Sequence, residues 1–365
     1  MLCQVILSLF ISCFVEGHAK SDSVLYAVED HAEGYCPSFY DQWCSNRSHL
    51  INNKTSVFTF QSTGRLGNQM LSYVMAMAMS DRAGFISFLP SHVLNRLSYF
   101  FEDIDTTKSV RPLESFCYSS IDWMSFHGSF VRFMEDPEMQ VDHAIEIHKT
   151  LRLLGNNLIQ NMRWDVIFDE PNLLAKVRHQ FTMRSVFVHQ AQQRLLSLKE
   201  AYYQRQKKML KKQRRFPLQF VGVHVRRTDG PVGIVKAYKL PELDPSYYLR
   251  AIDAYMTKYK NVLFVMVSDD IEWVKQMIIK RLPKAPLFVG GSGIPDDDDE
   301  IGLDFALLTQ CNHSITSYGT FSYWSSFLTN GSSLFPSMVF TANSKSNPLD
   351  SPWPIWAMPD SGLKY

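Results

Sequence analysis

The alternation of apolar and polar positions is most regular in the second half of the chain. An apolar run over 218–225 alternates like a buried strand. Further strands are predicted at 262–267, 286–289, 314–316 and 334–340. Helices with an apolar face are predicted between them, through 279, over 300–310 and over 321–328. Strand and helix alternation at these lengths indicates a parallel, doubly wound sheet.

The first half begins in the same way and then becomes less regular. Strand, turn, helix and strand are predicted in turn at 57–60, 64–69, 70–82 and 85–89, which makes one βαβ unit. Beyond it, residues 91–200 show weaker periodicity, with helices expected around 138–154 and 171–200. We therefore expect two α/β domains that face a cleft.

Composition and charge narrow the class of protein. The chain has 365 residues, of which 45% are hydrophobic, 13% aromatic and 20% charged, as in ordinary globular proteins. A net charge of +1 gives no general attraction for nucleic acid or an anionic membrane, so any phosphate recognition must be local. Seven of the eleven residues 205–215 are Lys or Arg. This run is more typical of a solvated helix face at a domain boundary than of a nucleic-acid site.

The N-terminal segment is typical of a targeting signal for the secretory pathway. Residues 1–15 are mostly apolar, which is short for a membrane-spanning helix. Gly17 and Ala19 resemble a signal-peptidase site, although no Lys or Arg precedes Lys20. A cleaved signal ending near Ala19 and a short uncleaved signal-anchor both place the rest of the chain in the lumen. We expect the Golgi, with the membrane contacted only through an uncleaved segment.

Sequons and cysteines agree with a lumenal location. Asn-x-Ser/Thr sequons occur at Asn46, Asn53, Asn312 and Asn330. The first two lie in a polar segment, whereas Asn312 lies between apolar runs where burial is an open alternative. Outside the targeting segment there are four cysteines, enough for two disulfides in three connectivities. Cys36 and Cys44 are the natural local pair, with free buried thiols as the alternative.

These features divide the chain into segments. Residues 1–19 are the targeting segment and 20–55 a stem. The two globular domains are expected at 56–204 and 216–345, and the basic connector 205–215 and a tail at 346–365 complete the chain.

The charged and polar residues that could bind a ligand follow the ends of the predicted strands in the second half. HVRRTD at 224–229 closes the first of them, and the next ends in Ser268, Asp269 and Asp270. Arg226 and Arg227 are suited to bidentate binding of phosphate. The acids are suited to sugar or ribose hydroxyls. Ser317, Gly319 and Thr320 lie at a strand-to-helix turn, where free N–H groups favour an anion.

Each of these residues also has a structural alternative. Arg226 can pair with Asp229, and Asp269 or Asp270 can cap the helix that follows. Residues 317–319 can be a simple turn. The four consecutive aspartates at 296–299 contain an Asp-x-Asp pattern, but solvated loop or helix N-terminal charge is the better interpretation than a metal site. It is the recurrence of polar groups at successive strand ends that favours binding of a sugar nucleotide.

Three segments carry a family resemblance. HVRRTD at 224–229 resembles the donor-binding motif of α1,2- and α1,6-fucosyltransferases and protein O-fucosyltransferases. GRLGNQM at 64–70 looks like the N-terminal motif of the α1,2 group, and DFALLTQCNHSITSYGTF at 304–321 is similar to the C-terminal motif of galactoside α1,2-fucosyltransferases. The resemblance spans about 57–340. Ser322 and Thr228 stand where family members often have Gly, and 91–200 matches poorly.

The resemblance implies a fold, a reaction and a set of site residues. The fold would be GT-B, two Rossmann-like domains facing a cleft, and the donor GDP-fucose, with inversion at the fucose carbon and no cofactor or essential metal. The acceptor would be a galactose-terminated glycan bearing the accepting 2-hydroxyl. Arg226 would be catalytic, with Asp229 the candidate base. The donor site would comprise His224, Arg227, Ser268, Asp269, Asp270, Asp304, Ser317, Gly319, Thr320 and Phe321.

Two further residues and two alternative functions complete the expectations. Arg65 and Asn68, across the cleft, are expected to contact the donor or the acceptor hydroxyl. Another regiochemistry, α1,6 or protein O-linked, is one alternative to the α1,2 transfer. A catalytically silent lumenal protein that binds glycan with the same fold is the other.

Overall fold

The computed structural model describes residues 57–60, 64–83, 86–108, 110–112, 123–126, 150–153, 171–205, 215–228, 242–329 and 331–336. The targeting segment, the stem, most of the basic connector and the tail therefore lie outside the described residues. The same is true of Asp229, Asn46, Asn53, Asn330, Cys36 and Cys44.

The first half forms a parallel sheet with the strand order β3-β2-β1-β5-β4. Its strands are β1 (Val57–Phe60), β2 (Ile86–Leu89), β3 (Val110–Pro112), β4 (Trp123–Phe126) and β5 (Thr150–Leu153). Helix α3 (Leu66–Ala83) connects β1 to β2, and α4 (Ser91–Phe100) connects β2 to β3. These elements contain the predicted βαβ unit, with α3 beginning four residues earlier than the apolar pattern suggests.

The prediction of a helix over 138–154 is wrong for its last residues. Residues 150–153, the last part of the helix expected over 138–154, form β5, which pairs with both β1 and β4. Its position between two strands supplies backbone hydrogen bonds on both edges, and such pairing overrides a weak helical periodicity. Residues 138–149 lie outside the described part of the chain.

The connection to the second half is two helices rather than the single one expected over 171–200. Helix α9 (Pro171–Gln180) and helix α10 (Ser185–Arg205) are separated by a short break. At the break, the backbone N–H of Arg184 donates to the carbonyl of Phe100 at 2.9 Å, and Met183 forms an isolated bridge with Phe101. The chain therefore turns at this point because it is pinned to the end of α4.

The second half forms another parallel sheet, with the order β10-β9-β6-β7-β8. Its strands are β6 (Gln219–Val225), β7 (Val262–Ser268), β8 (Leu287–Val289), β9 (His313–Ile315) and β10 (Ser333–Leu334). Its helices are α13 (Pro245–Lys258), α14 (Ile271–Met277), α15 (Asp298–Thr309) and α16 (Thr320–Leu328), with a 3-10 turn, η5 (Ile279–Arg281), after α14. The register pairs Val225 with Ser268, so β6 and β7 end at the same edge.

Helix α13 was absent from the sequence-based expectations, although its start signal is visible. Asp244 caps the helix by accepting a hydrogen bond from the backbone N–H of Tyr247, and Pro245 occupies the first turn. An Asp-Pro pair before a helix is a recognised N-terminal signal. The buried face of α13 carries Tyr248, Ile252 and Tyr255.

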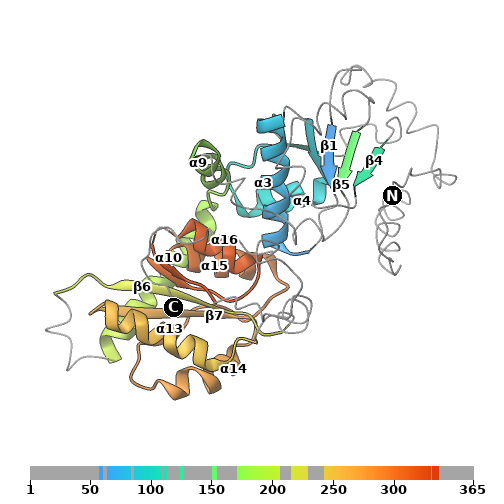
Figure 1. Ribbon diagram of the computed structural model, residues 1–365. Helices are drawn as coiled ribbons and strands as arrows, with labels where there is room; N and C mark the ends of the chain where they lie inside the picture. Colours follow the sequence, from blue (N-terminus) through green and yellow to red (C-terminus); the bar gives the residue numbers. More distant parts are fainter. Residues whose placement is uncertain are drawn as a thin grey trace.

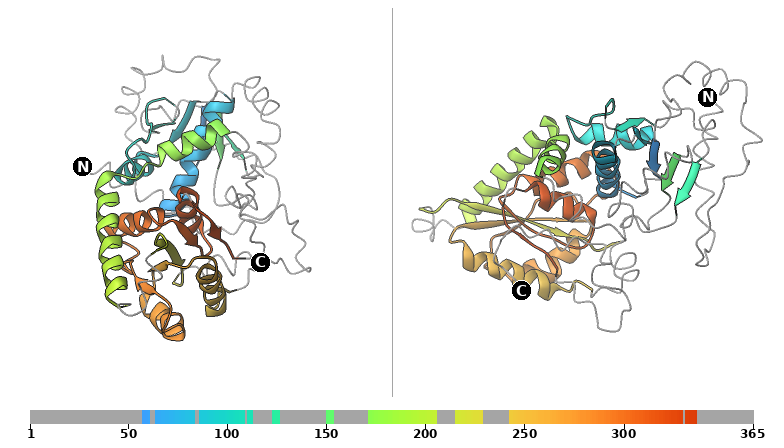
Figure 2. Two further views of the ribbon diagram at one scale, coloured as in Figure 1. Left: turned by 90° about the vertical axis from the view of Figure 1, so that its left-hand side faces the viewer. Right: turned by 45° about the horizontal axis from the view of Figure 1, so that its top comes forward.

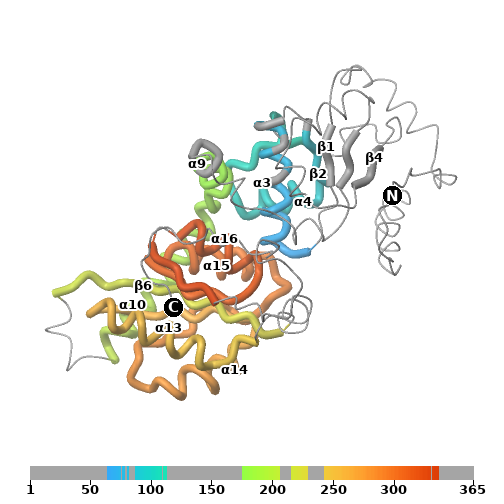
Figure 3. The backbone as a smooth tube through the Cα atoms, viewed as in Figure 1, coloured from blue at the N-terminus to red at the C-terminus, as the bar shows by residue number. Residues whose placement is uncertain are grey.

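Two apolar clusters explain how the halves are assembled. One lies under α13 and α14, on one side of the second sheet. The other joins α10, α15 and α16, on the opposite side, to α3 and α4 of the first half. Figures 1 and 2 show α15 and α16 on the side of the second sheet that faces the first half. In Figure 3 the tube shows α16 beside α3, which it contacts although the two helices are far apart in the chain. The predicted α/β class is confirmed, because each half contains a parallel five-stranded sheet with helices packed against it.

No helix in the described part of the chain has the length and apolar character needed to cross a membrane.

Candidate functional site

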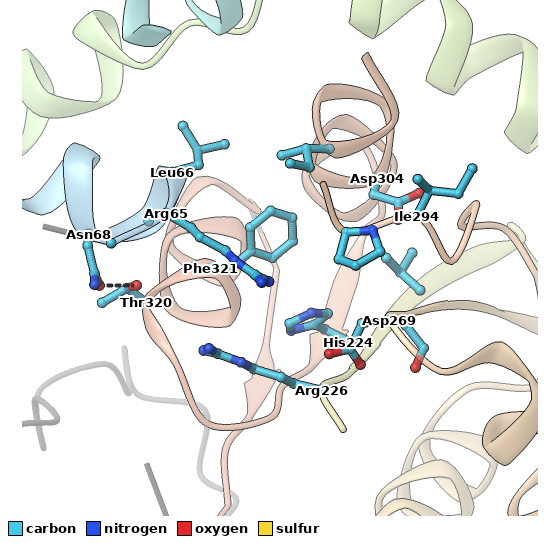
Figure 4. Close-up of a pocket in the computed structure, with 16 residues that line it drawn as sticks. Arg65, Leu66, Asn68, His224, Arg226, Asp269, Ile294, Asp304, Thr320 and Phe321 are labelled. Atoms are coloured by element: carbon cyan, nitrogen blue, oxygen red, sulfur yellow. Dashed lines mark hydrogen bonds between the residues drawn. The ribbon is translucent and has the colours of Figure 1, made fainter. Parts of the chain in front are cut away.

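A pocket of about 360 Å³ lies between the two halves, at the edge where β6 and β7 end. Figure 4 shows its walls. Its lining residues are Gly64, Arg65, Leu66, Gly67, Asn68, His224, Arg226, Val267, Ser268, Asp269, Ile294, Pro295, Ile301, Asp304, Thr320 and Phe321. This set includes part of each of the three sequence motifs. Nothing in the structure tests the roles assigned to these residues, and those roles stay predictions.

The N-termini of two helices meet at this pocket. Gly67, in the first turn of α3, lies so close to α16 that a Cβ there would be 2.6 Å from the backbone N of Phe321. Asn68 Oδ1 accepts a hydrogen bond from Thr320 Oγ1 at 2.7 Å, and Trp324 Nε1 donates to the Gly67 carbonyl at 2.9 Å. Unpaired backbone N–H groups and helix dipoles favour an anion at such ends. The convergence of two helices adds their effects.

Arg226 extends from the end of β6 to the N-terminus of α16. Gly319, the residue that caps α16, has φ 115° and ψ 153°, a region open almost only to glycine. A Cβ at Gly319 would overlap Arg226 Nη1. The glycine therefore leaves the space in which the guanidinium lies against the helix end, and the pocket gains a fixed positive charge beside two helix N-termini.

His224 is held by hydroxyls at the back of the pocket. Its Nδ1 lies 2.5 Å from Ser322 Oγ and 3.3 Å from Ser317 Oγ, and its ring packs against Phe321 with centroids 5.1 Å apart. Ser322 Oγ already accepts from the backbone N–H of Ser317 at 3.0 Å. The Ser322 proton is then available to Nδ1, which favours the imidazole tautomer with its proton on Nε2.

The two acids after β7 have different partners. Asp269 accepts from the backbone N–H of Arg227 at 2.7 Å and from the Thr228 hydroxyl at 2.6 Å, so it fixes the chain that follows β6. Asp270 caps α14 by accepting from Trp273 N at 2.9 Å, which is the structural alternative considered for it. Ser268 is buried, and its hydroxyl accepts from the Asp270 backbone N–H at 3.0 Å. Only Ser268 and Asp269 of these three line the pocket.

Arg227 is turned toward other partners. Its Nη1 lies 3.3 Å from Glu242 Oε1, and its guanidinium lies 4.4 Å from the centroid of the Trp273 ring. Arg227 and Gly319 are both absent from the residues that line the pocket. The structure therefore places the charge of Arg226 at the pocket and that of Arg227 beside α14.

Both departures from the family pattern add hydroxyls that bond within the site. Ser322 contacts the His224 ring, and Thr228 donates to Asp269. The sequence showed both as exceptions but not their contacts, because the partners are more than 40 positions away in the chain.

Asp304 is a titratable group in the pocket wall. Burial raises the pKa of its carboxyl from 3.8 to about 7, and a hydrogen bond from the Ser292 backbone N–H, 3.1 Å long, opposes that shift. The nearby negative charge of Glu300 raises the pKa further. Its charge therefore changes close to neutral pH.

This shift predicts a pH-dependent stability. Between pH 3.8 and about 7 the unfolded chain releases the Asp304 proton while the folded protein keeps it, so this group lowers stability as the pH rises. Asp304→Asn cannot ionise and should remove that loss, by up to a few kcal/mol at about 1.4 kcal/mol per pKa unit. Thermal denaturation from pH 5 to pH 8 measures the effect. We expect the variant to gain over the native protein above pH 7, and Asp253→Asn on the exposed face of α13 to show no such gain.

In the described part of the chain, no group of three or more His, Cys, Asp or Glu side chains is placed to hold a metal ion. Asp297 caps α15 by accepting from the backbone N–H groups of Asp299 and Glu300, at 2.9 and 3.1 Å. Helix N-terminal charge was the expected interpretation. The contacts of its three neighbours with the first half were not foreseen.

The candidate disulfide and glycosylation residues that the structure describes do not line the pocket. Cys311 is a buried free thiol, and the predicted pair of Cys36 and Cys44 lies outside the described residues. Asn312 is exposed, and its Oδ1 accepts from the Phe220 backbone N–H at 2.8 Å. Its glycosylation stays a prediction. The pocket also includes apolar side chains that the motifs did not single out, among them Leu66, Ile294 and Ile301.

Comparison with known proteins gives a consistent picture. Residues 178–347 match the family described as Glycosyl transferase family 11. The chain is 28% identical over 301 residues to galactoside alpha-(1,2)-fucosyltransferase 2 of Rattus norvegicus, covering 80% of this chain and 72% of that protein. It is 27% identical over 293 residues to galactoside 2-alpha-L-fucosyltransferase Sec1 of Mus musculus, covering 77% and 67%.

Solved structures of similar shape include two that contain GDP. A mutant of Arabidopsis thaliana FUT1 in complex with GDP has a TM-score of 0.48 at 12% identity, covering 82% of this chain and 77% of that one. POFUT1 in complex with GDP has a TM-score of 0.45 at 11% identity, covering 78% and 99%.

Proposed function

We propose that this chain belongs to glycosyl transferase family 11 and shares the reaction of the galactoside α-(1,2)-fucosyltransferases, to which its sequence is similar. It transfers L-fucose from GDP-fucose to the 2-hydroxyl of a galactose-type residue on a glycan. The observation that carries the proposal is the pocket in which Arg226 meets the N-termini of α3 and α16.

The pocket's charges suit a nucleoside diphosphate that must leave. Breaking the bond between fucose and phosphate leaves negative charge on GDP and positive charge on the sugar. Arg226 and the first turn of α16 face the same space, so both can stabilise the diphosphate as its charge grows. These groups are held before the substrate arrives, because Gly319 fixes the contact between them. No essential metal is needed for neutralising the leaving group in this proposal.

The first half provides the opposite wall. Arg65 and Asn68 line the pocket across from Arg226, and Asn68 is oriented by its bond with Thr320. The acceptor hydroxyl is proposed to enter on this side and attack the fucose carbon with inversion. Asp229, three residues beyond Arg226, stays the candidate base that takes up the proton, although it lies outside the described residues.

We also propose that the protein works in the lumen of the secretory pathway, in the Golgi. The support is the apolar segment at 1–15 together with the four sequons. Co-localisation of the tagged full chain with a Golgi marker tests this location, and a cytosolic signal would contradict it.

The activity test uses the lumenal part of the full chain with GDP-fucose and an array of glycan acceptors. We expect acceptor-dependent release of GDP and a fucosylated product from galactose-terminated acceptors, with a Fucα1-2 linkage on mapping. The same transfer should persist in EDTA, because Arg226 and the helix ends supply the positive charge. A product with an α1,6 or protein O-linkage would overturn the regiochemistry. GDP or glycan binding without transfer on any acceptor would identify a silent protein.

A further inference from the structure

The acidic run at the start of α15 contacts the first half of the protein at three points. Asp298 Oδ1 lies 2.6 Å from Arg96 Nη2 and 3.1 Å from Arg96 Nε, and Asp299 accepts a hydrogen bond from the Tyr99 hydroxyl. Asp296 lies 3.5 Å from Arg65, whose side chain lines the pocket. We call Arg96, Tyr99, Asp298 and Asp299 the clasp.

The segment just before the clasp is a wall of the pocket. Ile294 and Pro295 line the pocket, and Figure 4 shows Ile294 beside Asp304. Ile294 is 51% exposed, so little packing of its own fixes it. The turn before it is held by backbone bonds, because Ser292 N donates to Asp304 and Ile294 N donates to Ser292 Oγ at 3.1 Å. On its far side, this wall is connected to the first half by the exposed Arg65–Asp296 pair and then by the clasp.

The clasp is not what holds the two halves together. Beneath it, Phe101 and Phe305 pack with ring centroids 6.1 Å apart, and Phe100 and Phe187 pack at 5.9 Å. These rings belong to the buried core shared by both halves. A half-buried ion pair contributes far less to stability than such a core. The clasp is therefore strong enough to fix the position of a loop but too weak to decide how the two halves pack together.

We propose that Arg96 and Tyr99 are positioning residues for the nucleotide. Through Asp298 and Asp299 they hold the Ile294–Pro295 wall against the first half, and the fixed wall increases the affinity of the pocket for GDP. This inference rests on the proposed function, since it assumes that a guanosine diphosphate occupies the pocket. Neither Arg96 nor Tyr99 lines the pocket, so both act through the acidic run.

A double-mutant cycle on GDP binding tests the clasp. Arg96→Ala and Asp298→Asn should each raise the Kd for GDP about three- to fivefold, and the double variant should raise it no further, because both remove one interaction. The KM for GDP-fucose should follow, while kcat stays within about twofold. In about 0.5 M salt the difference between native protein and variants should shrink, since the pair is only half-buried. Lys275→Ala, which breaks an exposed pair with Glu272 on α14, is the matched control and should change nothing.

The outcomes separate this inference from the proposed function. If the native protein binds GDP and the single variants bind it equally well, the role proposed for the clasp is wrong, and the proposed function is unaffected. A Kd for GDP that rises in the double variant by the product of the two single effects would also contradict that role. If the native protein binds no GDP, the proposed function fails, and hydrogen exchange of the amides of 292–297 still decides whether the clasp exists. Faster exchange in Arg96→Ala would support the clasp as a brace, and unchanged exchange would overturn it.

Discussion

Arg226→Ala should lower fucose transfer by about a hundred- to a thousandfold, the cost typical of removing one preorganised group that stabilises charge in a transition state. The guanidinium lies at the end of β6 and against the first turn of α16, so both elements set its position. Initial rates of GDP release with a saturating galactose-terminated acceptor measure the loss. The loss should appear in kcat as well as in kcat/KM, because the diphosphate gains charge as the bond breaks.

The charge alone should not restore the activity. Arg226→Lys keeps the positive charge but loses the planar fork that binds phosphate oxygens in pairs, so it should recover only a small part of the rate. Arg250→Ala, on the exposed face of α13, is the matched control and should keep full activity. All three variants should have near-native melting temperatures. Native rates in Arg226→Ala would remove the main support for the proposed mechanism.

Gly319→Ala should have the second largest effect, because one methyl group disturbs both the helix end and the arginine. The backbone at φ 115° and ψ 153° costs about 1–3 kcal/mol for any residue with a Cβ. The methyl would also overlap Arg226 Nη1 and push the guanidinium away from the N-terminus of α16. We expect kcat/KM to fall about ten- to a hundredfold and the melting temperature to fall by several degrees.

A double variant can show whether Gly319→Ala lowers transfer by displacing Arg226 or by lowering the stability of the protein. If Gly319→Ala acts through Arg226, adding it to Arg226→Ala should lower transfer little further, although the stability losses still add. Rates should be measured well below the melting temperature of each variant. An unchanged kcat/KM in Gly319→Ala would show that the contact between this glycine and the arginine is irrelevant to transfer.

Several features of the site were predictable because they leave local traces in the sequence. The carboxyl end of β6 was correctly predicted at Val225 from its apolar alternation, and the arginines follow directly. The turn at Gly319 carries a glycine where only a glycine fits. Asp270 illustrates the limit, since a helix cap and a ligand for sugar hydroxyls have the same local pattern. Only its bond to Trp273 N showed that it caps α14.

Other features left no local trace. The strand β5 was taken for part of a helix because four residues cannot show a period, and its neighbours β1 and β4 are far away in the chain. The acidic run looked like solvated charge because its partners, Arg96 and Tyr99, precede it by about 200 residues. The wall formed by Ile294 was equally hidden, since one exposed apolar side chain in a loop carries no pattern.

The sequence by itself determined the α/β class, the positions of the strands along the second half and the three motifs that resemble those of the α1,2-fucosyltransferases. It could do so because burial repeats along each strand and helix and because motif residues are contiguous. The tertiary structure decided that Gly67 of the first motif lies against Phe321 of the third, and that Arg226 alone of the two arginines lines the pocket. Such choices depend on which distant surfaces pack together, and packing is a property of pairs of elements that no single segment contains.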